Sequence, residues 1–198
     1  MHLFGASGHG KVVADIAAAA GIEIIAFIDQ DISKRECYGL PVINKISEEI
    51  NKVAISIGNN QIRKKIAEEL NNVNFISLIH PKAIISNSIK IKPGTVIMGG
   101  VVINADTIIG KHCIINTNAS VDHDCIVEDF VHISPNVALA GNVAVGEGSH
   151  IGIGAAVIQG IKIGKWCMIG AGAVIIHDIP DYSVVVGNPG RIIKKNII

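Results

Sequence analysis

The stretch IMGGVVINADTIIGKHCIINTNASV, residues 97–121, decides the fold because a branched apolar residue returns in it at every sixth position. The same spacing continues in both directions without an inserted residue. The positions so defined are Ile79, Ile85, Ile91, Ile97, Ile103, Ile109, Ile115, Val121, Val127, Ile133, Leu139, Val145, Ile151, Val157, Ile163, Ile169 and Ile175. Such a fixed short period is the signature of a solenoid, in which each turn buries its neighbour's apolar face.

The residue four places after each of these anchors is mostly small or polar, as at Val101 and Ala119. Cys113, Cys125 and Cys167 hold the same position, so we expect them in the core as small apolar residues rather than as nucleophiles or ligands. Glycine often follows the anchor directly and is expected to relieve the backbone at each bend. Three six-residue faces then close a triangular coil of 18 residues, and successive coils pair as parallel strands about 4.8 Å apart.

This repeat resembles that of the hexapeptide-repeat acyltransferases, whose fold is a left-handed parallel β-helix. The resemblance supplies the handedness, which runs against the usual right-handed crossover. It implies a β-helical acyltransferase domain with a C-terminal tail over residues 79–198. Because structural and metal-dependent proteins share the repeat, the fold alone does not define the activity.

Residues 1–78 have a different pattern, in which short apolar runs alternate with helical segments. It predicts strands at 2–5, 23–28, 53–57 and 74–78, with helices at 11–20 and 60–70. Such alternation indicates a small, parallel, Rossmann-like α/β domain. Ligands of these sheets bind at the carboxyl ends of the strands. The candidate substrate-binding residues there are Gly8, His9, Gly10, Asp29, Gly58 and Asn59.

The first turn, GASGHGK at residues 5–11, matches neither of two known nucleotide-binding motifs. It fits GxxxxGK but continues with Val12, where magnesium binding needs Ser or Thr. As a dinucleotide fingerprint from Gly8 it has Val13 in place of the third glycine. A glycine-rich turn that opens a helix still offers free N–H groups to a phosphate, although it can also be a tight turn without a ligand. Asp29 is placed either to accept hydrogen bonds from a nucleoside or to hold its own turn.

The combination of GASGHGKV with the six-residue repeat resembles the PglD-type sugar-nucleotide N-acetyltransferases over essentially the whole chain. The related NeuD-type sialic acid O-acetyltransferases share this arrangement, so O-acetylation stays open as the alternative. The resemblance implies acetyl transfer from acetyl-CoA to the amine of a nucleotide-linked, UDP-type 4-amino-4,6-dideoxy sugar for a surface glycan or glycoprotein. It also implies a homotrimer with active sites between subunits. The residues do not decide which nucleotide, sugar or acyl group is used.

The segment NTNASVDHDC, residues 116–125, matches the family stretch that carries the general base. By this resemblance His123 is the base and Asp124 orients its ring. An imidazole with a pKa of about 6.5 can accept the proton of an attacking amine at neutral pH, and a neighbouring carboxylate increases its basicity. Gly141 lies 18 residues after His123, hence one coil further on, where the resemblance places the backbone N–H that stabilises the oxyanion.

The resemblance places acetyl-CoA along the outside of the β-helix, against His132, Ile153, Gly170 and Ala171. His132 and His150 are also 18 residues apart, so their side chains are expected to stack on each other. In this arrangement a direct attack on the thioester needs no covalent intermediate.

Composition and spacing exclude several other classes of function. Lys+Arg and Asp+Glu both number 17, which argues against nucleic acid or an anionic membrane as the main partner. No CxxC pair and no HxxxxH pair occurs, so no metal site is predicted and a carbonic anhydrase is disfavoured. A binding or scaffold protein of the ice-binding kind would show a regular threonine ladder. Without a signal-peptide pattern or an apolar run of bilayer length, a cytoplasmic protein is expected.

Overall fold

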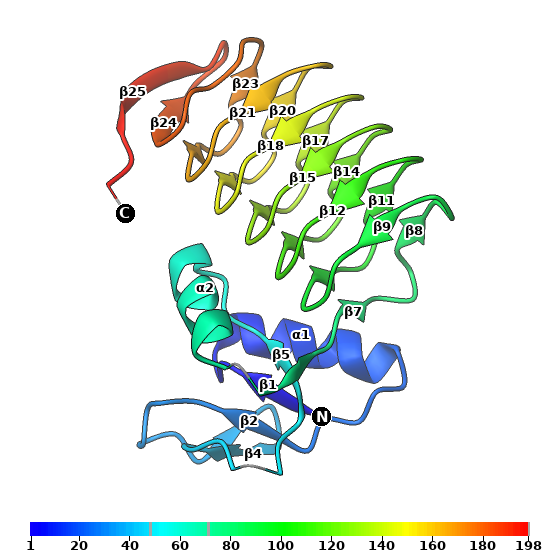
Figure 1. The fold of residues 1–198 in the computed structure, drawn as a ribbon, viewed down its shortest axis with the longest axis vertical. Coiled ribbons are helices and arrows are strands. Elements are labelled where there is room, and N and C mark those ends of the chain that lie inside the picture. Colours follow the sequence, from blue (N-terminus) through cyan, green and yellow to red (C-terminus); the bar gives the residue numbers. More distant parts are fainter. Residues whose placement is uncertain (48, 71, 198) are drawn as a thin grey trace.

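The computed structural model describes residues 1–47, 49–70 and 72–197, and Figure 1 shows an α/β part at one end of a tall stack of coils. The α/β part has one sheet with the strand order β3-β4-β2-β1-β5-β6 and two helices. Its elements are β1 (His2–Phe4), α1 (Gly8–Ala19), β2 (Ala26–Ile28), β3 (Glu36–Cys37), β4 (Leu40–Ile43), β5 (Lys52–Ile55), α2 (Asn60–Glu69) and β6 (Asn74–Phe75).

This part differs from the sequence-based expectation in two places. Helix α1 begins at Gly8 rather than at residue 11, because Ser7 is extended and serves as the N-cap residue. The hairpin of β3 and β4 was not predicted, since its strands are short and β4 contains Pro41. These two strands pair antiparallel, which makes an otherwise parallel sheet mixed.

The coil is built from three parallel sheets that the chain visits in turn. Sheet 1 contains β7 (Leu78–Ile79), β10 (Val96–Ile97), β13 (Ile114–Ile115), β16 (His132–Ile133), β19 (His150–Ile151), β22 (Met168–Ile169), β24 (Ser183–Val186) and the antiparallel β25 (Arg191–Lys195). Sheet 2 contains β8 (Ile84–Ile85), β11 (Val102–Ile103), β14 (Ser120–Val121), β17 (Ala138–Leu139), β20 (Ala156–Val157) and β23 (Val174–Ile175). Sheet 3 contains β9 (Lys90–Ile91), β12 (Ile108–Ile109), β15 (Ile126–Val127), β18 (Ala144–Val145) and β21 (Lys162–Ile163). We call the bends corners 1–2, 2–3 and 3–1, after the sheets that they join.

The register between coils is the 18-residue offset that the sequence predicts. Ile97 pairs with Ile115, and Ile115 pairs with Ile133. The anchors from Ile97 to Ile175 are buried, and so are the smaller residues four places further on. The three cysteines in that second position lie in the core as expected, and burial raises the pKa of the Cys113 thiol to about 12. The predicted fold class, a small α/β domain followed by a parallel β-helix, is confirmed.

The glycines that follow the anchors have a different purpose from the one expected. The left-handed backbone falls two residues later, for example at Asn118 and Asp124, with φ angles of 56° and 57°. At Gly152 a Cβ atom would lie 2.5 Å from the carbonyl oxygen of Ile169 in the next coil, and at Gly146 a Cβ atom would meet the backbone at 2.6 Å. These glycines therefore allow successive coils to approach each other, and the prediction that they relieve the bend was wrong.

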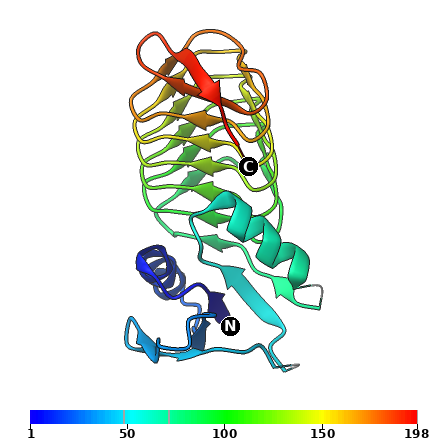
Figure 2. The ribbon, with the colours of Figure 1, turned by 90° about the vertical axis from the view of Figure 1, so that its left-hand side faces the viewer.

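Both helices of the α/β part pack against the coil. Val13 and Ala17 of α1 share a buried cluster with Leu78 and Val96 at the base of sheet 1. Helix α2 runs beside the lower coils, as Figure 2 shows from the side. The α/β part is thus fixed to the coil by apolar contact along its base and by α2 along one corner.

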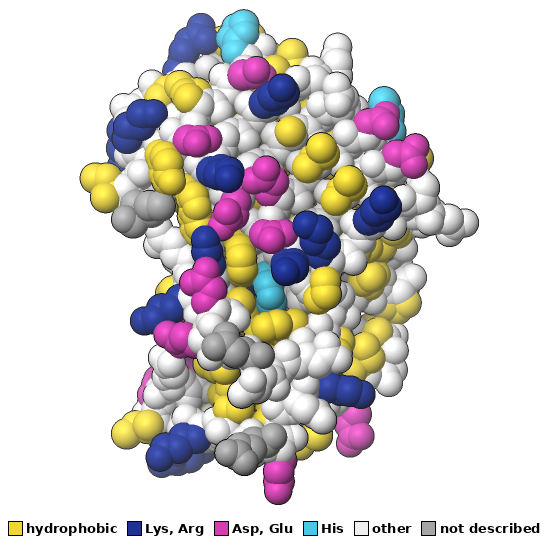
Figure 3. Space-filling view, in the orientation of Figure 1, with side chains coloured by type: hydrophobic (Ala, Val, Ile, Leu, Met, Phe, Trp, Pro, Cys, Tyr) yellow, Lys and Arg dark blue, Asp and Glu magenta, His cyan; other side chains and the backbone are white. Residues whose placement is uncertain are grey.

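The surface carries charges of both signs. Figure 3 shows basic and acidic side chains interspersed over one face of the molecule. Within the ranges that the structure describes, neither helix has the length and apolar character needed to cross a membrane.

Candidate functional site

The residues predicted as general base and orienting acid form a hydrogen-bonded pair at corner 2–3. The His123 Nδ1 atom lies 2.7 Å from the Asp124 Oδ2 atom, and both side chains are 59% exposed. Because Asp124 has a left-handed backbone, its carboxylate turns back toward the preceding ring. The charged acceptor at Nδ1 favours the tautomer with the proton on that atom, which leaves Nε2 free to accept a proton.

A second carboxylate supports the same histidine from the other side. Asp122 Oδ1 accepts a hydrogen bond of 2.8 Å from the His123 backbone N–H and another of 2.8 Å from the Asn104 side chain. The hydrogen bond to Asp124, followed by the charge of Asp122, raises the pKa of His123 above its ordinary value of 6.5. The imidazole is therefore a stronger base than an isolated histidine.

Gly141 lies directly over the His123 ring, one coil further on, as the 18-residue offset predicts. A Cβ atom at Gly141 would lie 2.6 Å from both the Cε1 and Nε2 atoms of His123. The absent side chain leaves room for the imidazole and keeps the backbone open to a reactant beside Nε2.

The predicted stacking of His132 and His150 on sheet 1 is confirmed. The two rings are nearly parallel, with centroids 4.5 Å apart. His132 Nε2 lies 3.2 Å from the Asn116 side-chain nitrogen, and His150 Nε2 lies 2.7 Å from the Ser134 hydroxyl. Burial first, and then the charges nearby, lower the pKa of His132 to about 3, so this ring is neutral at physiological pH.

An open groove beside this histidine pair contains all four residues predicted to bind the acyl donor. It has a volume of about 510 Å³, runs along corner 1–2, and has an apolar lining in which Ile153 is 57% exposed. Its predicted members are His132, Ile153, Gly170 and Ala171. The structure therefore brings these four residues together, and the shape suits a long flexible chain.

The glycine turn opens helix α1 close to the histidine pair. The ring centroids of His9 and His132 are 6.4 Å apart, and burial together with the charge of Arg63 lowers the pKa of His9 to about 4. A Cβ atom at Gly10 would lie 2.3 Å from the Gly5 carbonyl oxygen, so packing within the turn requires that glycine. Gly8 has open space around its Cα atom and is free to face a ligand.

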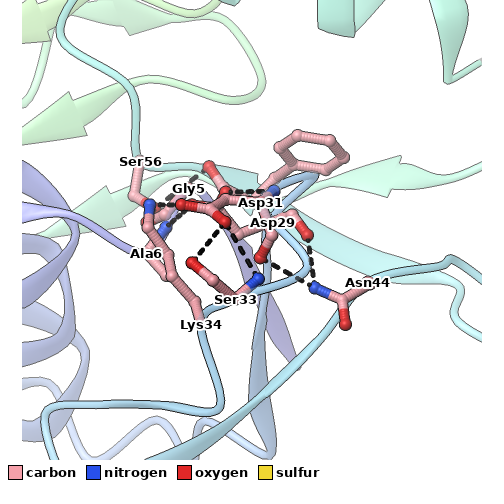
Figure 4. Close-up of polar contacts among 9 residues, drawn as sticks. Gly5, Ala6, Asp29, Asp31, Ser33, Lys34, Asn44 and Ser56 are labelled. Atoms are coloured by element: carbon pink, nitrogen blue, oxygen red, sulfur yellow. Dashed lines mark hydrogen bonds and ion pairs between the residues drawn. The ribbon is translucent and has the colours of Figure 1, made fainter.

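Asp29 stabilises the mouth of the sheet through its own contacts, which Figure 4 shows. Its Oδ2 atom accepts hydrogen bonds from the Ala6 backbone N–H at 2.9 Å and from Lys34 Nζ at 2.7 Å. Its Oδ1 atom accepts one from the Asp31 backbone N–H at 3.0 Å. Asp29 thus joins the glycine turn to the loop that follows β2, as the turn-holding alternative expects.

Gly58 and Asn59 form the turn between β5 and α2. The Asn59 side chain accepts a hydrogen bond of 3.0 Å from the Ile62 backbone N–H and so caps α2. Both residues line a second cavity of about 450 Å³, which also includes His132, His150 and Trp166. The candidate substrate turn therefore faces sheet 1 across this cavity.

The candidate site is divided between two corners of the chain. His123, Asp124 and Gly141 lie at corner 2–3, whereas the groove with Ile153 and Gly170 lies at corner 1–2. The strands of sheet 2 separate the two groups. One chain therefore assembles each half of the candidate site but does not bring the halves together.

Sequence reasoning missed the residues that hold α2 on the coil. Arg63 is buried at 1% exposure, and Asn60 and Lys64 also make contacts with the coil. The available signal was a charged residue on the helix face that Ile66 and Leu70 turn inward. Sequence reasoning also missed Asn116 and Ser134 as partners of the stacked histidines. No group of three or more His, Cys, Asp or Glu residues in the described ranges is arranged to hold a metal ion.

Comparisons with known proteins cover both parts of the chain. The model of the PglD N-terminal domain family matches residues 1–70. UDP-N-acetylbacillosamine N-acetyltransferase of Bacillus subtilis (strain 168) is 44% identical over 105 residues, which make up 48% of this chain and 49% of that protein. The match thus spans about half the length of this curated relative.

Solved structures match over nearly the full length. A variant of perosamine N-acetyltransferase from Caulobacter crescentus, in complex with CoA and GDP-perosamine, has a TM-score of 0.94 and 36% identity, with 98% of this chain and 96% of that chain covered. The acetyltransferase domain of PglB from Neisseria gonorrhoeae, in complex with acetyl coenzyme A, has a TM-score of 0.91 and 42% identity, with 97% and 98% covered. The chain therefore belongs to the PglD-type family of sugar-nucleotide N-acetyltransferases with a hexapeptide-repeat β-helix.

Proposed function

We propose that this protein transfers the acetyl group of acetyl-CoA to the amine of a nucleotide-linked amino sugar, a UDP-linked 4-amino-4,6-dideoxy sugar. The product would enter a surface glycan or glycoprotein, and the reaction would take place in the cytoplasm. The observation that carries the proposal is the His123–Asp124 pair directly beneath Gly141. The relatives solved with CoA, acetyl-CoA or GDP-perosamine support the same class of reaction.

In this reaction the lone pair of the sugar amine attacks the thioester carbonyl carbon. His123 Nε2 accepts the proton that the amine loses, while Asp124 holds the proton on Nδ1 and stabilises the imidazolium. The Gly141 backbone N–H donates to the developing oxyanion. The carbon–sulfur bond then breaks, the thiolate of CoA leaves, and the proton held by His123 returns to the sulfur.

We assign the two substrates to different parts of the chain. Residues 1–78 would bind the nucleotide sugar, with the α1 turn at Gly8–Gly10 and the turn at Gly58–Asn59 facing its phosphates. In this scheme Asp29 acts mainly by shaping the α1 turn, since its oxygens already accept internal hydrogen bonds. Residues 79–198 would carry the transferase site, with acetyl-CoA in the groove at corner 1–2.

The pH dependence of the reaction tests the role of Asp124. His123 is a base only when neutral, so kcat/KM falls as pH drops through its raised pKa. Asp124→Asn removes the charged acceptor, lowers that pKa, and is expected to move the acidic limb to lower pH while reducing the plateau. Asp106→Asn is the matched control, because Asp106 has the same left-handed conformation one coil earlier. An acidic limb at the same pH in the Asp124 variant would contradict the assignment.

We further propose that the complete site forms between subunits of a homotrimer. The two halves lie at different corners of one chain, so the base of one subunit must meet the groove of another. Sheet 2 carries small side chains between these corners, among them Ser120, Ala138 and Ala156, and a second copy can approach such a surface closely.

Mixed oligomers test this shared site. His123→Ala lacks the base, and Ile153→Glu places a charge in the groove at an exposed position, so each variant alone is expected to be inactive and folded. Random mixing of the two chains restores an intact base opposite an intact groove at about a quarter of the interfaces of a cyclic assembly. Activity is measured after the two variants are co-expressed. A mixture as inactive as its components would place both halves of the site within one chain.

The function itself is tested by measuring CoA release from acetyl-CoA with a panel of acceptors. The panel contains UDP- and GDP-linked 4-amino sugars, free sialic acid and CMP-sialic acid. Turnover with an amino-sugar nucleotide supports the proposal and identifies the nucleotide. Turnover only with a sialic acid would assign the protein to O-acetylation instead.

A further inference from the structure

Arg63 is the most deeply buried cation among the described residues, and all of its donors are used. It lies in the first turn of α2 and is 1% exposed. Its Nε atom donates to the His112 carbonyl at 2.7 Å. Its Nη1 atom donates to the carbonyls of Ile57 and Gly58 at 3.0 and 3.2 Å, and its Nη2 atom donates to Asn60 Oδ1 and the Phe130 carbonyl at 2.8 and 2.9 Å. These five bonds match the five N–H donors of a guanidinium group.

This arrangement is an expensive way to fill a core position. No carboxylate in the described ranges forms an ion pair with Arg63. Burial lowers its pKa to about 10, so the group still carries its charge at neutral pH. An apolar side chain of similar volume commonly stabilises a core at least as well as a buried charge. The particular advantage of Arg63 is its geometry, because a rigid planar fork fixes five acceptors at once.

The acceptors come from two parts of the molecule that must keep a fixed distance. Ile57 and Gly58 belong to the turn that faces the 450 Å³ cavity. His112 and Phe130 lie at corner 3–1 of two successive coils, and both have a left-handed backbone, with φ angles of 53° and 61°. Arg63 therefore joins the turn to the two coils from which β13 and β16 start.

Neighbouring residues of α2 extend this connection to the next coil. Asn60 Nδ2 donates to the carbonyls of Gly148 and Ser149 at 2.9 and 3.2 Å. Lys64 Nζ lies 2.6 Å from Glu147 Oε1. With three consecutive coils held by one helix, the turn before that helix has a defined height along the stack.

We propose that Arg63 is a positioning residue for the nucleotide-sugar half of the site. Its guanidinium holds the Gly58–Asn60 turn over His132 and His150, and the placement of this turn sets the affinity for the nucleotide sugar. The inference rests on the proposed function for the identity of that ligand. The acetyl-CoA groove lies at corner 1–2, away from these contacts, so its affinity is not set by Arg63.

The test compares Arg63→Lys, Arg63→Met and the control Lys65→Met. Lys65 is on the same helix but has a 77% exposed side chain. An ammonium group has three donors instead of five, so Arg63→Lys is expected to raise the KM for the nucleotide sugar about 10-fold, as loss of one or two hydrogen bonds would. Arg63→Met is expected to raise it further. The KM for acetyl-CoA should stay within about twofold in all three.

Both Arg63 variants are also expected to lose thermal stability, so the split between the two KM values is the decisive readout. A purely structural role would reduce kcat with the folded fraction and leave both KM values unchanged, which would overturn the proposal. Amide hydrogen exchange over residues 57–62 gives a second readout that does not need activity. Faster exchange in Arg63→Met but not in Lys65→Met supports the proposal, and equal exchange in both refutes it. If the wild-type chain acetylates no amino-sugar nucleotide, the proposed function fails while the exchange result still decides whether Arg63 holds the turn.

Discussion

His123→Ala is expected to lower kcat by about 10²–10⁴-fold, the usual contribution of a general base, and to leave the fold intact. The side chain is 59% exposed, and its ring bonds only to the equally exposed Asp124 carboxylate. Removal therefore creates no cavity and leaves no buried group without a partner. Turnover with the amino-sugar nucleotide at saturating substrate measures the effect, and thermal unfolding checks stability.

The chain contains its own control for this variant. His177 lies three coils beyond His123 at the same corner position, and Asp178 follows it as Asp124 follows His123. The Asp178 carboxylate, however, accepts a hydrogen bond of 2.8 Å from the Lys162 backbone N–H. His177→Ala should therefore keep full activity. A near-normal rate in His123→Ala would remove this histidine from the mechanism.

Gly141→Ala is expected to lower kcat by about 10²-fold without a matching loss of stability. The new methyl group would lie 2.6 Å from two atoms of the His123 ring, so the ring must move by about 1 Å to reach ordinary contact distance. The exposed imidazole can swing away at little cost to folding. Its Nε2 atom then leaves the position from which it takes the proton, and a displacement of that size can cost 10²-fold in rate.

Gly99→Ala is the matched control for this substitution. Gly99 also follows an anchor by two residues and also faces a histidine, but its Cβ atom would lie 3.3 Å from His80 Nδ1. A loss of activity in Gly99→Ala equal to that in Gly141→Ala would show that the effect comes from strain in the coil. An unchanged kcat in Gly141→Ala would mean that His123 does not act from the observed position.

The coil could be predicted from the sequence because its contacts are local and periodic. Each anchor packs on the residue 18 positions away, so simple counting places Gly141 over His123 and His132 beside His150. The same counting predicted which cysteines are buried. Position within a coil thus follows from residue number alone.

The contacts between the two parts of the chain could not be counted in this way. Arg63 meets His112 and Phe130 because α2 runs along corner 3–1, and no period relates the helix to the coil. The occupancy of the Asp29 carboxylate was equally hidden, since it depends on how Lys34 folds back from an irregular loop. The glycines after the anchors were misinterpreted because a close approach and a left-handed bend favour the same residue.

The stacking of coils gives this enzyme family a built-in ruler. The turn before α2 is anchored to coils whose positions are fixed, and the spacing from one coil to the next is about 4.8 Å. The reach from the nucleotide module to the base can therefore change only in whole steps, through gain or loss of 18 residues. Lengthening the substrate by one sugar would exceed one step, so the architecture measures its ligand in discrete units and rejects intermediate lengths by geometry rather than by a dedicated side chain.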